Sequence, residues 1–348
     1  MRCLVLRPGV VVALAAALAV VLGVARGAAT EGLLAPADAT GWITRIHNAA
    51  NKGNYQGTMV FSAGGALSSS RVAHYVVGDQ VYEQLEALDG RQQRISRLND
   101  RVQTVWPQTR TAVLEKRETL AAWSATPLNV QPQALEQYAM RREADARVAG
   151  RDAAVFVLEP RDALRHAQRL WADLATGLLL RADVLGSPAG AVASASARAV
   201  LESTAFSEVA IGVKPPPEAV TQPLKTAAQL EGYRVIRPQQ QRTALDNEGW
   251  LLANPVPGYT LAGCVRRGME ASGDEASVLQ AVFADGLTHV SVFVESYNPS
   301  RPRTEMQALH GATATLSQRR GDYWVTVVGD APLATLKLFA LALDRRKP

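Results

Sequence analysis

The chain has 348 residues, of which 47% are hydrophobic and 20% are charged, and its formal net charge at pH 7 is +5. Acidic and basic residues are interspersed, so the chain lacks the concentrated basic surface that generic nucleic-acid binding requires. A globular composition over this length favours two domains rather than one.

The N-terminus has the layout of a secretory signal peptide. Arg2 and Arg7 precede an apolar run from Val10 to Val24, and small residues continue to Ala29. Basic, then apolar, then small residues is the order of such a signal. The run of about 15 residues is shorter than the roughly 20 that span a bilayer, although an uncleaved membrane anchor is the alternative. We expect residues 1–29 to be removed and the mature protein to lie in the periplasm. Cys3 leaves with the signal, so Cys264 cannot belong to a disulfide framework.

A proline-rich segment divides the mature chain. Five prolines and three consecutive glutamines lie between Val213 and Gln241. Proline fixes its own backbone and lacks a donor, which excludes the segment from a sheet interior and favours an extended, semi-rigid chain. We therefore expect a linker at residues 213–241, between an N-terminal domain of residues 30–212 and a C-terminal domain of residues 242–348.

The N-terminal domain is predicted to begin with a helix and to continue with strands. Apolar residues recur at helical spacing from Trp42 to Ala50, after candidate caps at Asp38 and Thr40, and Gly53 can close the helix. Short helices are expected between residues 115 and 138. About ten antiparallel strands should curl and enclose an apolar cavity. Their β-type runs lie at residues 55–61, 71–77, 80–88, 92–98, 102–106, 138–148, 153–159, 167–172, 178–185 and 197–209.

Seven large side chains on these strands are candidates to line a cavity that binds lipid. The alternative is that they form an ordinary core, as most large apolar side chains do. The candidates are Met59, Phe61, Tyr75, Leu85, Trp106, Trp171 and Leu180.

The C-terminal domain is predicted to be a smaller α+β unit, with an antiparallel sheet and a terminal helix. Asp330 is a candidate N-cap, and an apolar stripe runs from Leu333 to Leu343. The predicted strands lie at residues 259–266, 278–284, 288–295, 306–316 and 322–328.

Several motifs resemble the MucB/RseB family of periplasmic regulators of the sigma-E envelope-stress response. The resemblance covers essentially the whole mature chain, in the order signal, first domain, linker, second domain. The motifs are Asn54 to Phe61, Glu83 to Leu85, Leu88 to Gly90, Val148 to Asp152, Leu158 to Asp162, Arg169 to Trp171, Thr176 to Arg181, Trp250 to Tyr259 and Phe283 to Val294.

The resemblance implies an α+β protein whose N-terminal domain is a half-open antiparallel β-barrel with helices, similar to LolA and LolB. It also implies a partner, the periplasmic tail of an RseA- or MucA-like anti-sigma factor, which the protein shields from regulated proteolysis until lipid or lipopolysaccharide releases it. One departure is the segment Leu164 to Gln168, where His166 and Gln168 replace expected tyrosines. It predicts a less aromatic cavity mouth, and a diverged paralogue with another anti-sigma partner is an alternative.

Catalytic, cofactor and metal motifs are not found in the sequence. It has no Gly-x-Ser-x-Gly elbow, phosphate-binding glycine loop or dinucleotide fingerprint, and its five histidines lack metal-ligand spacing. We therefore expect a binding protein rather than an enzyme, with no cofactor. Two rival functions stay open, a lipid or lipoprotein carrier and a hydrolase of unfamiliar architecture, as does a homo-oligomer.

Basic residues in the C-terminal domain are candidates for binding the partner. Guanidinium groups at strand ends and turns can pair with peptide carboxylates or with glycolipid phosphates. Ordinary solubilising charge is the alternative. The candidates are Arg266, Arg267, Arg301, Arg303, Arg319 and Arg320.

Overall fold

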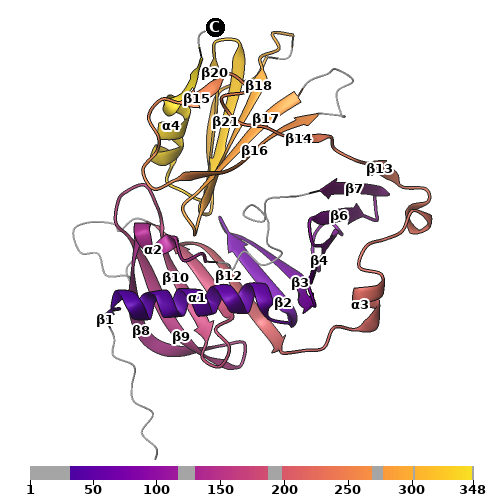
Figure 1. The fold of residues 1–348 in the computed structure, drawn as a ribbon, viewed down its shortest axis with the longest axis vertical. Helices are drawn as coiled ribbons and strands as arrows, with labels where there is room; N and C mark the ends of the chain where they lie inside the picture. The colour runs from indigo at the N-terminus through magenta and orange to yellow at the C-terminus, as the bar shows by residue number, and fades with distance from the viewer. Residues whose placement is uncertain (1–31, 117–129, 187–197, 269–276, 301, 347–348) are drawn as a thin grey trace, which may run out of the picture.

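The computed structural model describes residues 32–116, 130–186, 198–268, 277–300 and 302–346. Two large, mainly antiparallel sheets, each with a helix packed against it, and a small two-stranded sheet form the molecule (Figure 1). The α+β class predicted from the sequence is confirmed. The predicted signal peptide, residues 1–29, lies outside the described residues, as does much of the segment expected to hold short helices. No helix among the described residues is long and apolar enough to cross a membrane.

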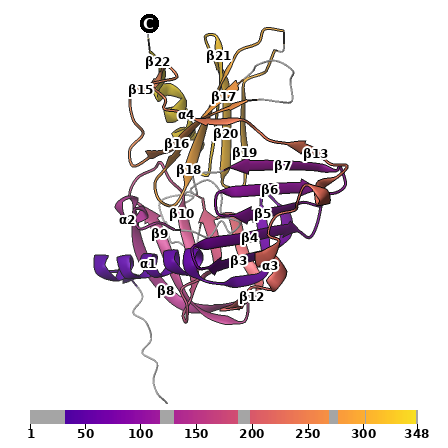
Figure 2. The same ribbon diagram turned by 45° about the vertical axis from the view of Figure 1, so that its right-hand side comes forward.

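The larger sheet has 13 strands in the order β1-β8-β9-β10-β11-β12-β2-β3-β4-β5-β6-β7-β13. All neighbours are antiparallel except β13, which is parallel to β7. The end strands β1 and β13 do not pair with each other, so the curled sheet stays open (Figures 1 and 2). Its strands are β1 (Gly32–Leu33), β2 (Tyr55–Ala63), β3 (Ala66–Val77), β4 (Gln80–Ala87), β5 (Arg94–Leu98), β6 (Arg101–Trp106), β7 (Thr111–Lys116), β8 (Tyr138–Val148), β9 (Arg151–Pro160), β10 (Ala167–Asp173), β11 (Leu179–Leu185), β12 (Val200–Ile211) and β13 (Arg234–Ile236).

Helix α1 (Pro36–Lys52) crosses one face of this sheet (Figure 1). Its buried residues recur three or four apart, which is the spacing of a single helical face, and Ile43 and Ile46 are fully buried. They pack on the largest core of the domain, together with Phe156. The helix ends before Gly53 as predicted, but Asp38 and Thr40 lie inside it rather than capping it. Pro36 starts the helix because proline lacks the donor that a first turn leaves unpaired.

The C-terminal sheet has the order β14-β16-β17-β18-β21-β20-β19. Helix α4 (Leu333–Ala342) packs on one face of it, and β15 and β22 pair beside the helix. The predicted cap is wrong, because Pro332 precedes the helix and the Asp330 carboxylate accepts a hydrogen bond from the Thr313 hydroxyl instead. The strands are β14 (Gln240–Arg242), β15 (Trp250–Leu252), β16 (Thr260–Gly268), β17 (Ser277–Ala284), β18 (His289–Ser296), β19 (Met306–His310), β20 (Thr313–Arg320), β21 (Tyr323–Gly329) and β22 (Leu343–Arg345).

The proline-rich segment is docked on the N-terminal domain rather than being a free spacer. It contains α3 (Pro217–Thr221), a 3-10 turn (Ala228–Leu230) and β13. The Gln103 amide exchanges two hydrogen bonds with the backbone of Lys225, at 3.1 and 2.8 Å. Leu230 is buried against β6 and β7. We call residues 213–236 the strap, and only residues 237–239 lie between it and the C-terminal sheet.

Candidate functional site

The N-terminal domain reaches into the C-terminal domain through Arg165, which lies in the turn between β9 and β10. The side chains of Arg165 and Asp285 are both fully buried, and Arg165 Nε donates to Asp285 Oδ2 at 2.8 Å. Nη2 donates to the carbonyl oxygen of Pro257 at 2.7 Å, and the guanidinium carbon lies 4.6 Å from the Tyr259 ring centre. A second carboxylate, that of Asp162, also pairs with Arg165. A buried ion pair is tolerated when its other donors and acceptors are satisfied, as they are here.

The Asp285 carboxylate accepts hydrogen bonds from both domains. Its carboxylate accepts hydrogen bonds from the backbone N–H groups of Leu287 at 2.9 Å and Thr288 at 2.7 Å. The Tyr138 hydroxyl of the N-terminal domain donates to it at 3.2 Å. Burial, and then the nearby Asp285 charge, raise the pKa of Tyr138 well above its ordinary value, which keeps this donor protonated. The carboxylate is thereby fixed between the domains.

Hydrogen bonds to backbone carbonyl groups also join the two domains. The Thr335 hydroxyl of α4 donates to the carbonyl oxygen of Leu164 at 2.8 Å, and the Gln131 N–H donates to that of Gly286 at 2.8 Å. Gly258 has φ of +74°, and a Cβ atom there would lie 2.3 Å from Arg165 Nη2. A glycine is needed at this point because the two domains approach so closely.

A second group of contacts joins the domains at the turn between β19 and β20. A Cβ atom on Gly311 would lie 2.7 Å from Ala63 Cβ and 3.0 Å from the Leu201 carbonyl oxygen. Burial raises the pKa of the neighbouring Glu202 to about 7, the charge of Asp330 across the interface adds to this, and the Ala312 N–H opposes it. Two carboxylates from different domains therefore approach each other here.

His166 belongs to the same region. Burial lowers its pKa, and the charge of Asp330 partly opposes the shift. Its Nδ1 atom is buried without a hydrogen-bond partner in the part of the chain that the structure describes. We call all these inter-domain contacts the seam: those of residues 63–64, 131–138, 162–166 and 201–202 with residues 257–259, 285–288, 310–313 and 330–335.

The seven candidate cavity residues do not meet in one cavity. Strand register places four of them, Met59, Phe61, Leu85 and Trp106, on the face of the sheet that carries α1. Met59 belongs to the core beneath α1, and Leu85 packs against that core. The other three, Tyr75, Trp171 and Leu180, point to the opposite face, and Trp171 and Leu180 form a separate small core with Ala153 and Val155.

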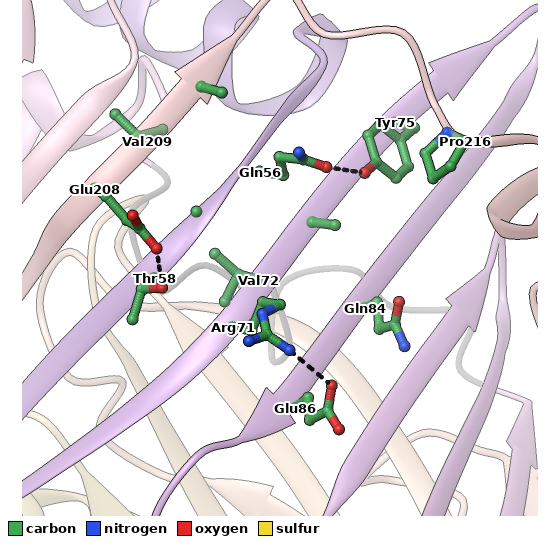
Figure 3. A pocket seen from close by; sticks show the side chains of 13 residues that line it. Gln56, Thr58, Arg71, Val72, Tyr75, Gln84, Glu86, Glu208, Val209 and Pro216 are labelled. Carbon is green, nitrogen blue, oxygen red and sulfur yellow. Dashed lines mark hydrogen bonds and ion pairs between the residues drawn. The ribbon is translucent and has the colours of Figure 1, made fainter.

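Two neighbouring clefts on the outer face of this domain carry polar and charged side chains. One cleft of about 500 Å³ lies on β2, β3, β4 and β12 beside Pro216 (Figure 3). Tyr75 donates to Gln56 Oε1 at 2.6 Å there, and Thr58 donates to Glu208 Oε1 at 2.8 Å. A second cleft, of about 320 Å³, continues beneath the strap and shares Tyr75 and Pro216. The structure thus places a groove that carries polar and charged side chains on the outer face of the sheet.

Three of the six candidate arginines are held within the C-terminal domain. Arg266 pairs with Glu248 and donates to Ser277 Oγ at 2.6 Å. Arg303 donates twice to Glu295, at 3.0 and 2.8 Å. Arg320 donates to the carbonyl oxygens of Ala340 and Leu343, the latter at 2.6 Å, and so satisfies the end of α4.

Two of the other three arginines lie on strands that the structure describes. Arg319 is exposed, and its guanidinium carbon lies 4.0 Å from the Tyr297 ring centre. Arg267 lies on β16, opposite Gln240 and Val278. Arg301 lies outside the described residues.

The sequence does not reveal that Arg165 and Asp285 join the two domains. Arg165 and Asp285 are single charged residues in turns, and nothing in their local pattern distinguishes them from solvated charges. Gly258 and Gly286 are the residues in the sequence that could have indicated a close approach of the two domains. Both adopt positive φ angles beside the contact. Across the described ranges, no cluster of three or more His, Cys, Asp or Glu side chains is placed to hold a metal ion.

Comparisons with known proteins agree with the two-domain structure. The family models described as MucB/RseB N-terminal domain and MucB/RseB C-terminal domain match residues 38–224 and 244–344. Sigma factor AlgU regulatory protein MucB of Pseudomonas aeruginosa is 28% identical over 312 residues, covering 88% of this chain and 91% of that protein. Sigma-E factor regulatory protein RseB of Haemophilus influenzae is 24% identical over 295 residues, covering 85% and 87%.

Two solved structures of MucB bound to MucA are similar to this chain over most of its length. A crystal structure of MucB in complex with MucA(peri) matches with a TM-score of 0.65 and 27% identity, over 89% of this chain and 100% of that one. The complex of Pseudomonas aeruginosa MucA and MucB matches with a TM-score of 0.66 and 26% identity, over the same shares of the two chains. These relatives are regulatory proteins rather than enzymes. With both domain models matched in order along the chain, the protein belongs to the MucB/RseB family.

Proposed function

We propose that this protein is a periplasmic regulator that binds the periplasmic tail of a MucA- or RseA-like anti-sigma factor and shields it from regulated proteolysis. The observation that carries the proposal is the match over 89% of the chain to MucB in complex with MucA(peri). Residues 1–29 serve as the signal peptide that delivers the protein, which their basic, apolar and small residues support.

The proposed division is an N-terminal domain of residues 30–212, a linker of residues 213–241 and a C-terminal domain of residues 242–348. The gap between the two family models, from residue 224 to residue 244, supports a division in this region. Strap contacts at Gln103 and Leu230 extend the N-terminal unit to about β13. Residues 237–239 are therefore the hinge about which the two folded units can move relative to each other.

Release by lipid or lipopolysaccharide is part of the proposal. The groove beneath the strap offers amide, hydroxyl and charged groups that can bind a lipid headgroup. A ligand that binds one strap position better than another shifts the population between domain arrangements. A lipid carrier that buries acyl chains is the less supported function, because α1 occupies the inner face of the sheet over β2, β3 and β8 to β11.

Among the candidate arginines, we propose Arg319 as the contact to the partner. Its side chain is exposed, and its stacking on Tyr297 orients the guanidinium without using all of its donors. Arg303 and Arg320 are engaged within the domain, so their replacement would alter folding as well as binding.

Equilibrium binding tests the proposal. The mature protein would be titrated into a fluorescently labelled periplasmic tail of the anti-sigma factor from the same organism. Saturable binding at micromolar concentrations or below is expected. The Arg319→Ala variant should bind more weakly, while Arg71→Ala, an exposed arginine of the N-terminal domain, should bind as the original protein does. Absence of binding by the unmodified protein would overturn the proposal.

A further inference from the structure

Strand β19 ends the C-terminal sheet with an open edge. All five of its residues, Met306–His310, are exposed, and two of them are large and apolar. Met306 is 49% exposed and Leu309 is 69% exposed. No strand in the part of the chain that the structure describes pairs with the outer side of β19.

The other sheet edges are short. β14 has three polar residues, β13 has three residues followed closely by Pro238, and β1 has two. Proteins usually keep edges short, charged, bulged or interrupted by proline, because an unpaired edge can pair with another chain. β19 has five residues, no lysine, arginine or carboxylate, and an unbroken register with β20. β19 therefore lacks the features that usually prevent an edge strand from pairing with another chain.

The chemistry of this edge defines what can occupy it. In an antiparallel ladder, alternate residues of an edge strand direct their N–H and C=O groups outward, where only an extended backbone satisfies them in sequence. Leu309 is paired with Ala314 of the core beneath α4, whereas Met306 is paired with Ser317 on the opposite face. An added strand would contact apolar side chains on both of its faces. The occupant is an extended peptide with neighbouring apolar residues.

The edge also leads to the seam. A Cβ atom on Gly64, in the turn between β2 and β3, would lie 3.1 Å from His310 Nδ1 at the end of β19. Leu67 follows that turn and is 72% exposed. A peptide that leaves β19 at His310 thus reaches an exposed apolar side chain of the N-terminal domain.

We propose that the edge of β19 accepts an extended segment of the anti-sigma tail as an eighth strand, and that Leu67 continues this track onto the N-terminal domain. The inference rests on the proposed function and gives it a mechanism. A protease must bind the extended backbone of its substrate. The backbone N–H and C=O groups of a segment paired with β19 are already hydrogen-bonded, so the protease cannot bind them. Contact with both domains would also make binding depend on an intact seam.

Lysine substitution of the exposed edge residues tests the proposal. The Met306→Lys/Leu309→Lys double variant places charges on the edge without altering a buried side chain. Its affinity for the labelled tail should fall about tenfold or more, as for loss of a central apolar contact. Leu341→Lys is the matched control, because Leu341 is 71% exposed on α4, and it should bind as the unmodified protein does. Thermal unfolding checks that both variants fold.

Hydrogen exchange on the unmodified protein gives a second, independent reading. Outward amides of β19 should exchange rapidly in the free protein and slowly in the complex, while those of β14 stay unchanged. Tail binding with unaltered affinity in the double variant and no protection of β19 would overturn this inference but leave the proposed function standing. No tail binding by the unmodified protein would overturn both.

Discussion

Several charged residues lie in the interior of the two domains and are paired there. Glu83 and Arg97 form a buried pair on the α1 face of the sheet, with Arg97 Nη1 2.9 Å from Glu83 Oε2. His74 lies beside them, with its Nε2 atom 3.7 Å from Glu83 Oε1, and it stacks on Tyr55. Burial lowers the pKa of His74, while the charge of Glu83 opposes the shift.

Replacing Glu83 by Gln should strongly destabilise the N-terminal domain. It would leave the Arg97 guanidinium buried without its charge partner, which typically costs about 3–5 kcal/mol. Chemical denaturation measures the loss. Glu86→Gln is the matched control, because Glu86 pairs with the solvent-accessible Arg71 and Arg94, and such surface pairs contribute about 1 kcal/mol or less. Equal effects of the two substitutions would show that the buried pair has no special role.

Glu202 should make the stability of the molecule depend on pH. Its pKa is raised to about 7 in the folded protein from 4.5 in the unfolded chain, so its stabilising effect is complete below pH 4.5 and is lost as the pH rises through about 7. Glu202→Gln should remove this loss and stabilise the protein at pH 8 by about 2 kcal/mol, allowing for partial exposure. At pH 4 the two proteins should be equally stable.

Chemical denaturation at pH 4 and pH 8 measures the effect of Glu202→Gln on stability. A Glu202→Gln variant that is no more stable than the unmodified protein at pH 8 would show that Glu202 is not held neutral at the seam.

His166 has the opposite effect on the pH dependence of stability. Its pKa is lowered in the folded protein, so stability falls as the pH drops below 6.5, and His166→Gln should improve stability at low pH.

At the scale of elements, the strap is the feature that most changes the expected architecture. Prolines correctly excluded residues 213–241 from a sheet interior, but they did not reveal that this segment packs on the outer face of β3 to β7 (Figure 2). Docking depends on Leu230 and on the amide of Gln103, which are distant in sequence from each other. Local composition cannot show such a contact.

Leu230→Ala should release the strap without unfolding the domain. Deleting a buried leucine side chain typically costs about 2–5 kcal/mol, and here the loss falls on one peripheral segment. Hydrogen exchange and limited proteolysis should both accelerate within residues 213–236. Leu230→Met, which preserves volume, should change little. Exchange rates that match those of the unmodified protein would mean that the strap is held by other contacts.

Most strands were predictable because their side chains alternate and turn residues separate them. β7 was missed because Thr111–Lys116 offers a weak alternation beside a run of charged residues. Residues 306–316 were predicted as one strand but form a hairpin, because Gly311 adopts φ of +60° and reverses the chain. The helix stripe from Leu333 to Leu343 is largely buried as expected. Patterns thus predicted elements well, whereas contacts between distant elements needed the structure.

At the scale of the whole molecule, the seam decides whether the two domains act as one body. Arg165→Met should separate them, because Asp285 would stay buried without its cation, at a cost of about 3–5 kcal/mol. Thermal unfolding should then show two transitions in place of one. The Arg165→Met/Asp285→Leu double variant removes both charges and should recover much of the stability. A single, unshifted transition in Arg165→Met would show that the seam does not couple the domains.

Protection of the anti-sigma tail from its protease tests the central claim most directly. The mature protein would be incubated with the purified periplasmic tail from the same organism and the protease that first cleaves it, with and without lipopolysaccharide. Our account predicts that cleavage slows when the protein is present and recovers when lipopolysaccharide is added. Cleavage at the same rate with and without the protein would contradict it.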